Sequence, residues 1–276
     1  MKLISGEQLQ SLSQISFCKD RNCIIDKQVK THSQNINYID LFTLDEIANY
    51  THIFCYTDAI NDFLQKFFNH LRNDITIITH NSDLGIDSKY EHYLNGNKIK
   101  RWFCQNRYIN HNKLSSLPIG LANSQWEHGN QDMLLKIKSE NNKKEILVYK
   151  NFDIGTNIGA RTHCNDITNK LGISMYPRDT NENYWRSISK SVFTIAPHGN
   201  GVDSHRIWEC LYLESVPVVE YHECFSQFKH LPILFVDSYR DITKDFLKQK
   251  IDIFYPFSKY NLEILDLNYW KYKMYE

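Results

Sequence analysis

Residues 184–219 read YWRSISKSVFTIAPHGNGVDSHRIWECLYLESVPVV. The pattern that ends near Ser189 predicts a helix, and the apolar run at 192–196 predicts a buried strand. A turn with two glycines follows at 197–201, and a second helix is expected from about Asp203. A strand, a glycine turn and a helix in this order are typical of parallel sheets joined by crossover helices. The stretch therefore predicts an α/β fold.

The same alternation of apolar runs and helical patterns extends over the whole chain. Between 56 and 75, apolar residues recur at intervals of three and four, which predicts an amphipathic helix. Runs rich in Ile, Val and Phe predict strands at 22–26, 51–56, 75–79, 99–104, 145–149, 192–196, 216–220 and 232–236. The α/β prediction therefore holds from one end of the sequence to the other.

The segment 115–130, SSLPIGLANSQWEHGN, interrupts this alternation with a proline and two glycines. At about 150 residues per domain, a chain of 276 residues has room for two. We therefore expect two Rossmann-like lobes that face a cleft, an N-terminal lobe at 1–125 and a C-terminal lobe at 126–258. A final helix at 259–276 is expected to pack back on the N-terminal lobe.

Composition excludes several classes of protein. The chain carries 32 Lys and Arg against 32 Asp and Glu, so no overall positive field favours a nucleic acid partner. The longest apolar runs are far too short to cross a bilayer, and the N-terminus lacks a signal-peptide core, so we expect a cytoplasmic protein. The 7 cysteines form no Cys-x-x-Cys pair, and buried reduced thiols are expected rather than disulfides or zinc ligands.

The turn at 197–201 has the features of an anion-binding site. Gly199 and Gly201 allow a sharp bend around Asn200 and a close approach of the backbone to a ligand. The free amides at the N-terminus of the following helix would point at that ligand. We therefore expect a phosphate group at this turn.

The start of the following helix adds groups suited to a nucleotide. Asp203 or Ser204 is placed to cap the helix, which alone would explain either residue, and Ser204 would also lie close to the phosphate. Arg206 and Glu209 are three residues apart and share one helix face. The arginine suits a phosphate, and the carboxylate suits both hydroxyls of a ribose. The alternative is a surface ion pair between them, worth about 0.3–0.5 kcal/mol.

A nicotinamide-dependent Rossmann enzyme is an alternative interpretation of the same stretch. Gly199 and Gly201 after a strand, with Glu220 at the end of the next strand, partly match the dinucleotide-binding fingerprint. Ser204 stands at the third glycine position, and a complete α/β lobe precedes the motif. Both departures favour a different nucleotide ligand.

The stretch 184–219 resembles the donor-binding lobe of the exostosin family of glycosyltransferases. That family carries a Tyr, then Phe before Pro-x-Gly, then Ser-x-Arg-x-x-Glu and finally Pro-Val. The positions that fit this pattern without a gap are Tyr184, Phe193, Pro197, Gly199, Ser204, Arg206, Glu209, Pro217 and Val218. Residues 151–167 match more weakly and supply a basic residue, Arg161.

The resemblance implies a GT-B architecture and an inverting transfer, usually from a UDP-sugar bound in the C-terminal lobe to an acceptor against the N-terminal lobe. It also implies no cofactor and no metal held by a carboxylate motif, and the chain contains no Asp-x-Asp pair. Arg161, Arg206 and the amides of 199–201 would then stabilise the departing diphosphate. A solvated arginine near a helix start is the alternative for Arg161. Many family members have Arg where this chain has His198, so a phosphate contact there would depend on pH.

An inverting transfer needs a base for the proton of the acceptor hydroxyl. Loops at the carboxyl ends of strands in the first lobe rim the expected cleft and offer Asp83, His80 and Asp58. Asp83 ranks first and His80 second. The alternatives are a turn residue for Asp83, a structural histidine for His80 and the cap of the following helix for Asp58.

The sequence therefore predicts a glycosyltransferase that moves a sugar from a nucleotide sugar to a glycan or glycoconjugate. The rival from another class is a non-catalytic protein that binds nucleotide sugars or glycans and lacks the base. Release of free nucleoside diphosphate from UDP- or GDP-sugars distinguishes the two.

Overall fold

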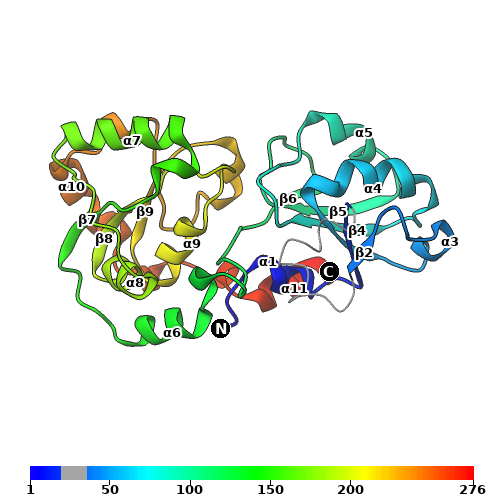
Figure 1. Cartoon of the computed structure of the whole chain (residues 1–276), viewed down its shortest axis with the longest axis horizontal. Helices are drawn as coiled ribbons and strands as arrows, with labels where there is room; N and C mark the ends of the chain where they lie inside the picture. The colour runs from blue at the N-terminus through cyan, green and yellow to red at the C-terminus, as the bar shows by residue number, and fades with distance from the viewer. Residues whose placement is uncertain (20–35) are drawn as a thin grey trace. The chain divides into compact units, whose positions relative to one another are not determined.

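The computed structural model describes residues 1–19 and 36–276 and divides into two compact units (Figure 1). Unit 1 comprises Met1–Gln125 and Asp266–Glu276, and unit 2 comprises Trp126–Leu265. The expected strand at 22–26 lies outside the described residues. Each unit has a parallel sheet with helices, which confirms the α/β prediction.

The sheet of unit 1 has the strand order β2-β1-β3-β4-β5-β6, and every described pair is parallel. Every residue of β4, ITIITH, is buried, as expected for a central strand that is covered on both faces. The strands are β1 (Ile15–Cys18), β2 (Ile36–Tyr38), β3 (His52–Tyr56), β4 (Ile75–His80), β5 (Ile99–Cys104) and β6 (Leu114–Ser116).

Helices lie on both faces of this sheet (Figure 1). The apolar face of α4 is buried, and Phe63 and Phe67 meet Phe17 of β1 with ring centroids 5.0 and 5.5 Å apart. This aromatic packing is the interaction that the three-and-four spacing predicts. The described helices of unit 1 are α1 (Gly6–Gln10), α3 (Leu44–Ile47), α4 (Ile60–Phe67), α5 (Glu91–Leu94) and α11 (Leu267–Tyr275).

The C-terminal helix α11 is shorter than the sequence predicts. Asp266 caps it by accepting a hydrogen bond from the amide of Asn268 at 2.9 Å, so the helix begins at Leu267. Residues 259–265 belong to unit 2, and only Asp266–Glu276 returns to unit 1. There the ring of Trp270 lies 6.3 Å from Phe103, and Tyr275 stacks on His52 at 4.0 Å. The expected boundary at 259 is therefore wrong by seven residues.

Unit 2 has the strand order β10-β9-β8-β7, again parallel in every described pair. The strands are β7 (Ile146–Tyr149), β8 (Ser191–Ile195), β9 (Val216–Glu220) and β10 (Leu234–Val236). The described helices are α6 (Gln131–Ser139), α7 (Ile158–Lys170), α8 (Asn181–Ser189), α9 (His205–Tyr212) and α10 (Lys244–Phe254). The helix expected from about Asp203 therefore begins at His205.

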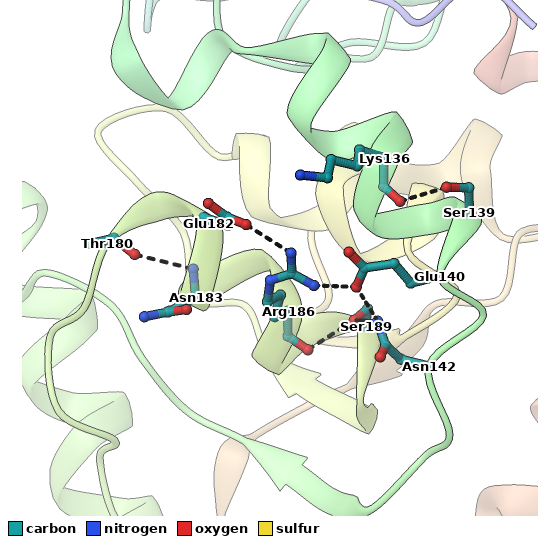
Figure 2. Close-up of polar contacts among 9 residues, drawn as sticks. All are labelled: Lys136, Ser139, Glu140, Asn142, Thr180, Glu182, Asn183, Arg186 and Ser189. Atoms are coloured by element: carbon teal, nitrogen blue, oxygen red, sulfur yellow. Dashed lines mark hydrogen bonds and ion pairs between the residues drawn. The ribbon is translucent and has the colours of Figure 1, made fainter.

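A polar network joins α8 to the end of α6 (Figure 2). Arg186 forms ion pairs with Glu182 one turn away, at 2.7 Å, and with Glu140 after α6. Asn142 donates hydrogen bonds to Glu140 and to Ser189 at 3.1 Å each. These contacts fix the helix that carries Tyr184, two residues before Arg186.

No helix among the described residues is long and apolar enough to cross a membrane. The described residues contain no group of three His, Cys, Asp or Glu side chains placed to hold a metal ion. The described cysteines are buried and form no disulfide with one another, and they are Cys18, Cys55, Cys104, Cys164, Cys210 and Cys224. Cys23 lies outside the described residues.

Candidate functional site

The groups of the quoted stretch gather at one edge of the sheet of unit 2. Because β7, β8 and β9 are parallel, their carboxyl ends meet at the same edge. The loop after β8 carries the turn 197–201, and α7, α8 and α9 bring side chains beside it. We call this cluster the arginine site, and its members are Phe152, Arg161, Tyr184, His198, Gly199, Ser204, Arg206 and Glu209.

Arg161 is a buried cation of the arginine site. It projects from α7, is 5% exposed, and donates hydrogen bonds from Nε to the carbonyl of His198 at 3.0 Å and from Nη1 to that of Asp153 at 2.7 Å. Burial, together with the positive charge of Arg206, lowers the pKa of Arg161 to about 10, so the side chain remains a cation at pH 7. The solvated arginine considered as the alternative is wrong.

Arg206 is the second cation, and it lies close to the first. The guanidinium carbons of Arg161 and Arg206 lie 5.9 and 6.0 Å from the ring centroid of Phe152, and that of Arg206 lies 5.7 Å from Tyr184. Burial alone would lower the pKa of Arg206. The neighbouring Tyr184 and Glu209 have a larger opposite effect, so the pKa of Arg206 is raised. The Nε atom of Arg206 is buried and has no hydrogen-bond partner. A buried donor without a partner is costly, so this atom is suited to a ligand oxygen.

Ser204 adds a second unpartnered polar atom. It occupies the N-cap position of α9 with extended backbone (φ −130°, ψ 144°), but its side chain makes no cap hydrogen bond. The residue is 8% exposed, and its Oγ has no partner. The carboxylate of Asp203 accepts hydrogen bonds from the indole of Trp208 at 2.8 and 3.1 Å. The side chain of Ser204 therefore does not cap α9, and Asp203 has a structural contact with Trp208.

The glycine turn differs from the expected one in its backbone. The positive-φ glycines of the described residues are Gly120 and Gly172, so neither Gly199 nor Gly201 is required by a left-handed conformation. A Cβ at Gly199 would lie 3.5 Å from Nη2 of Arg161, in ordinary van der Waals contact. Glycine here leaves space beside the guanidinium, and Asn157 fixes the turn by donating to the carbonyl of Gly199 at 2.7 Å. Asn200 is exposed.

His198 is held by the backbone of the neighbouring strand. Its Nε2 donates a hydrogen bond to the carbonyl of Glu220 at 3.0 Å, and its ring lies beside His222 and Phe225. Burial lowers the pKa of His198, which favours the neutral imidazole. The side chain therefore links the end of β8 to the end of β9, and the phosphate contact of His198 stays a prediction.

Glu209 is buried and contacts the hydroxyl of Tyr184. It is 3% exposed, and its Oε2 accepts a hydrogen bond from the hydroxyl of Tyr184 at 3.0 Å. The described contacts include no ion pair between Arg206 and Glu209 within 4.0 Å. The surface ion pair considered as the alternative is therefore absent from the described contacts, and the ribose contact stays a prediction.

His80 is sealed inside unit 1. The residue is 1% exposed, its Nε2 lies 3.1 Å from the carbonyl of Pro118, and its Nδ1 lies 3.0 Å from Oδ1 of Asn81. A Cβ placed on Gly6 would lie 2.9 Å from the same Nδ1, which shows how closely α1 covers the ring. Both ring nitrogens are therefore engaged within the protein, and the structural interpretation fits His80 better than a base.

Asp83 and Asp58 are exposed in the loops after β4 and β3. The backbone carbonyl of Asp83 accepts a hydrogen bond from the side-chain amide of Asn106 at 3.2 Å. This bond holds the loop backbone and leaves the carboxylate at the surface. Asp58 lies in a 3-10 turn before α4, whose N-cap residue is Ala59. Capping of α4 by Asp58 is therefore wrong, and both aspartates stay candidates for the base.

Sequence reasoning did not single out Phe152, a member of the arginine site, or Asn157, which bonds to the carbonyl of Gly199. Phe152 follows β7 and is the ring that both arginines share, and no spacing rule identifies a lone Phe in a loop. Asn157 left a signal, because its side chain caps α7 by accepting from the amide of Ala160 at 3.2 Å. An Asn before a helical pattern is a typical N-cap.

A separate pocket of about 360 Å³ lies near the amino-terminal ends of the strands of unit 2. It is lined by the end of α6, the segment 141–144 and the ends of α8 and α9. Lys144 at its wall donates hydrogen bonds to the carbonyls of Ser189 at 2.8 Å and Leu213 at 3.2 Å. These contacts pair the carbonyl-rich ends of two helices with a cation.

The fold and the site together define a two-unit parallel α/β protein whose second unit carries a cationic, partly unsatisfied cluster of side chains, a candidate ligand site. No family model matches the chain, and no curated protein matches it. The resemblance to the exostosin family therefore rests on the positions between 184 and 219.

Proposed function

We propose that the protein is a glycosyltransferase that transfers a sugar from a nucleotide sugar, most often a UDP-sugar, to a glycan or glycoconjugate with inversion. The observation that carries the proposal is the pair of neighbouring cations Arg161 and Arg206, without a carboxylate ion pair among the described contacts. The unpartnered Oγ of Ser204 and Nε of Arg206 add donors for anionic oxygens. A diphosphate supplies the charge and the acceptors that these groups lack.

The chemistry assigned to the arginine site is stabilisation of the leaving group. The acceptor hydroxyl loses its proton to a base, and its oxygen attacks the anomeric carbon from the face opposite the diphosphate. The bond from that carbon to the diphosphate oxygen breaks, and negative charge grows on the departing nucleoside diphosphate. Buried guanidinium groups oriented before the reaction stabilise this charge more strongly than water does. The proposal assigns no metal to this step.

We further propose the GT-B arrangement, in which unit 1 supplies the acceptor surface and the base. Asp83 is the first candidate and Asp58 the second, because both carboxylates are exposed after strands of the parallel sheet. A carboxylate in such a loop can reach a hydroxyl brought to the same edge.

The experiment measures nucleoside diphosphate released from a panel of UDP- and GDP-sugars, together with the affinity for UDP and GDP. Arg206→Ala is expected to weaken nucleoside diphosphate binding about 10- to 150-fold, the range for a charge-assisted contact worth about 1.5–3 kcal/mol. Arg72→Ala, which removes an exposed arginine of unit 1, is the matched control and should bind as the unaltered protein does. Failure of the unaltered protein to bind any of these nucleotides would reject the proposal.

A non-catalytic nucleotide-sugar-binding protein is the second candidate. The sealed position of His80 favours it, since this removes one of the expected bases from contact with a substrate. Tight binding of UDP or GDP with no release of nucleoside diphosphate, on any donor and acceptor, would support this function over transfer.

A further inference from the structure

One aromatic side chain of unit 2 is exposed and lies two ring contacts from Tyr184 of the arginine site. Tyr176 lies between α7 and α8 and is 39% exposed, whereas its neighbour Tyr149, the last residue of β7, is buried. A large ring held at the surface suits contact with a flat ligand better than with water.

Tyrosine rings form a continuous row from the arginine site to this position. Arg206 lies over the ring of Tyr184 at 5.7 Å, and Tyr184 lies 6.1 Å from Tyr149, centroid to centroid. Tyr149 in turn lies 4.9 Å from Tyr176, with an interplanar angle of 56°. The exposed ring is therefore two ring contacts away from the tyrosine that touches the cation.

The backbone fixes Tyr176 in place. Its amide donates to the carbonyl of Lys150 at 2.8 Å, which joins the segment to the residue after β7. The side-chain amide of Asn151 donates to the carbonyl of Pro177 at 2.7 Å. A ring on a segment tied down at two successive residues loses little freedom when a ligand stacks on it, so less of the contact energy is lost to ordering.

We propose that Tyr176 is the platform on which the nucleobase of the bound nucleotide stacks. The inference rests on the proposed function, because it requires the diphosphate to lie at Arg161 and Arg206. A nucleoside diphosphate has an anionic end and a flat aromatic end, separated by a pentose. The arginine site fits the first end, and the row of tyrosines leads from it to an exposed ring that fits the second.

The test separates the base from the phosphates. Binding of UDP, GDP and inorganic pyrophosphate is measured by calorimetry for the unaltered protein, Tyr176→Ala and Tyr176→Phe. Stacking predicts that Tyr176→Ala weakens UDP or GDP about 5- to 150-fold, the range for loss of one base–aromatic contact. Pyrophosphate binding should not change, and Tyr176→Phe should stay within about 2-fold of the unaltered protein because the ring remains. Tyr272→Ala, at an exposed tyrosine of α11, is the matched control.

The other outcomes are distinguishable. If Tyr176→Ala binds UDP and GDP as tightly as the unaltered protein, the platform is refuted while the proposed function stands. An equal loss of pyrophosphate and nucleotide would show that the substitution disturbs the arginine site itself, which also refutes stacking. If the unaltered protein binds none of the three probes, the proposed function fails and the platform fails with it.

Discussion

Ser204 shows at the level of one residue how a site differs from a helix cap. Its backbone has the N-cap conformation, yet Oγ makes no cap bond and has no other partner. Thr180 is the useful comparison, because its Oγ1 caps α8 by accepting from the amide of Asn183 at 3.2 Å (Figure 2). The two residues have similar positions and different hydrogen bonds.

Ser204→Ala should therefore leave the free energy of unfolding nearly unchanged and weaken binding of UDP or GDP. Loss of a working cap costs about 1 kcal/mol, and this cost is expected for Thr180→Ala with no loss of nucleotide affinity. Loss of one hydrogen bond from the hydroxyl to an anionic phosphate oxygen, worth about 1.5–3 kcal/mol, corresponds to about 10- to 150-fold in affinity. Denaturant unfolding and calorimetry measure the two quantities. A stability loss for Ser204→Ala equal to that of Thr180→Ala would show that Ser204 is only a cap.

Sequence spacing predicted which residues lie together in the arginine site, but it did not predict how deeply each of them is buried. The three-residue interval places Arg206 and Glu209 on one helix face, and both lie at Tyr184. The depth of Glu209 depends on how α8 packs over α9, which no local rule contains. The burial of His80 could not be predicted for the same reason, because it depends on α1, which is distant in the sequence and packs against the ring.

At the level of elements, most strands were predicted from their apolar runs, whereas β1, β2 and β6 were not. The strands that fall on predicted ones are β3, β4, β5, β7, β8, β9 and β10. By contrast, β6 is Leu-Ser-Ser, and its burial comes from pairing with β5 and not from its own residues. β1 was missed for a similar reason, since Ser16 interrupts four residues that are nevertheless all buried.

Lys144 joins two elements and makes the stability of unit 2 depend on pH. Burial lowers its pKa to about 8, and the nearby Glu214 only partly opposes that effect. In the unfolded chain the amine titrates near its ordinary value of 10.5. Between these values the unfolded state binds more protons than the folded state, so the free energy of unfolding should rise with pH.

The measurement compares unfolding of the unaltered protein with that of Lys144→Met between pH 7 and pH 10. The difference in the free energy of unfolding between the two proteins should shift in favour of the unaltered protein above pH 8. Lys136→Met, at an exposed residue of α6, should run parallel to the unaltered protein over the same range. A constant difference between the unaltered protein and Lys144→Met would contradict the lowered pKa.

At the level of the whole molecule, a proline and two glycines marked the junction between the units in the sequence, but Gly120 is needed for a different physical reason. The first segment of unit 1 ends at Gln125, within the segment that interrupts the strand–helix alternation. Gly120 in that segment is required within unit 1 itself, because φ is +66° and a Cβ would lie 2.4 Å from the carbonyl of Ile4. The glycine permits the chain beside Leu121 to pair with the N-terminal segment at Ser5. The proline and glycines therefore marked the junction in the sequence. The need for Gly120 follows only from its contact with Ile4, which is distant in the sequence.

The proposal assigns donor binding to unit 2 and the base to unit 1, and from this we predict the effect of a substitution at Asp83. If unit 2 holds the donor and unit 1 supplies the base, Asp83→Asn should lower transfer about 10²- to 10⁴-fold, the usual contribution of a general base, and leave UDP and GDP affinity unchanged. The variant keeps the size of the side chain, and the loop is held through the backbone carbonyl of Asp83, so folding should be unaffected. Asp252→Asn, at an exposed aspartate of α10, is the control. A loss of nucleotide affinity in Asp83→Asn would argue against separate roles for the units, and full transfer activity would move the assignment to Asp58.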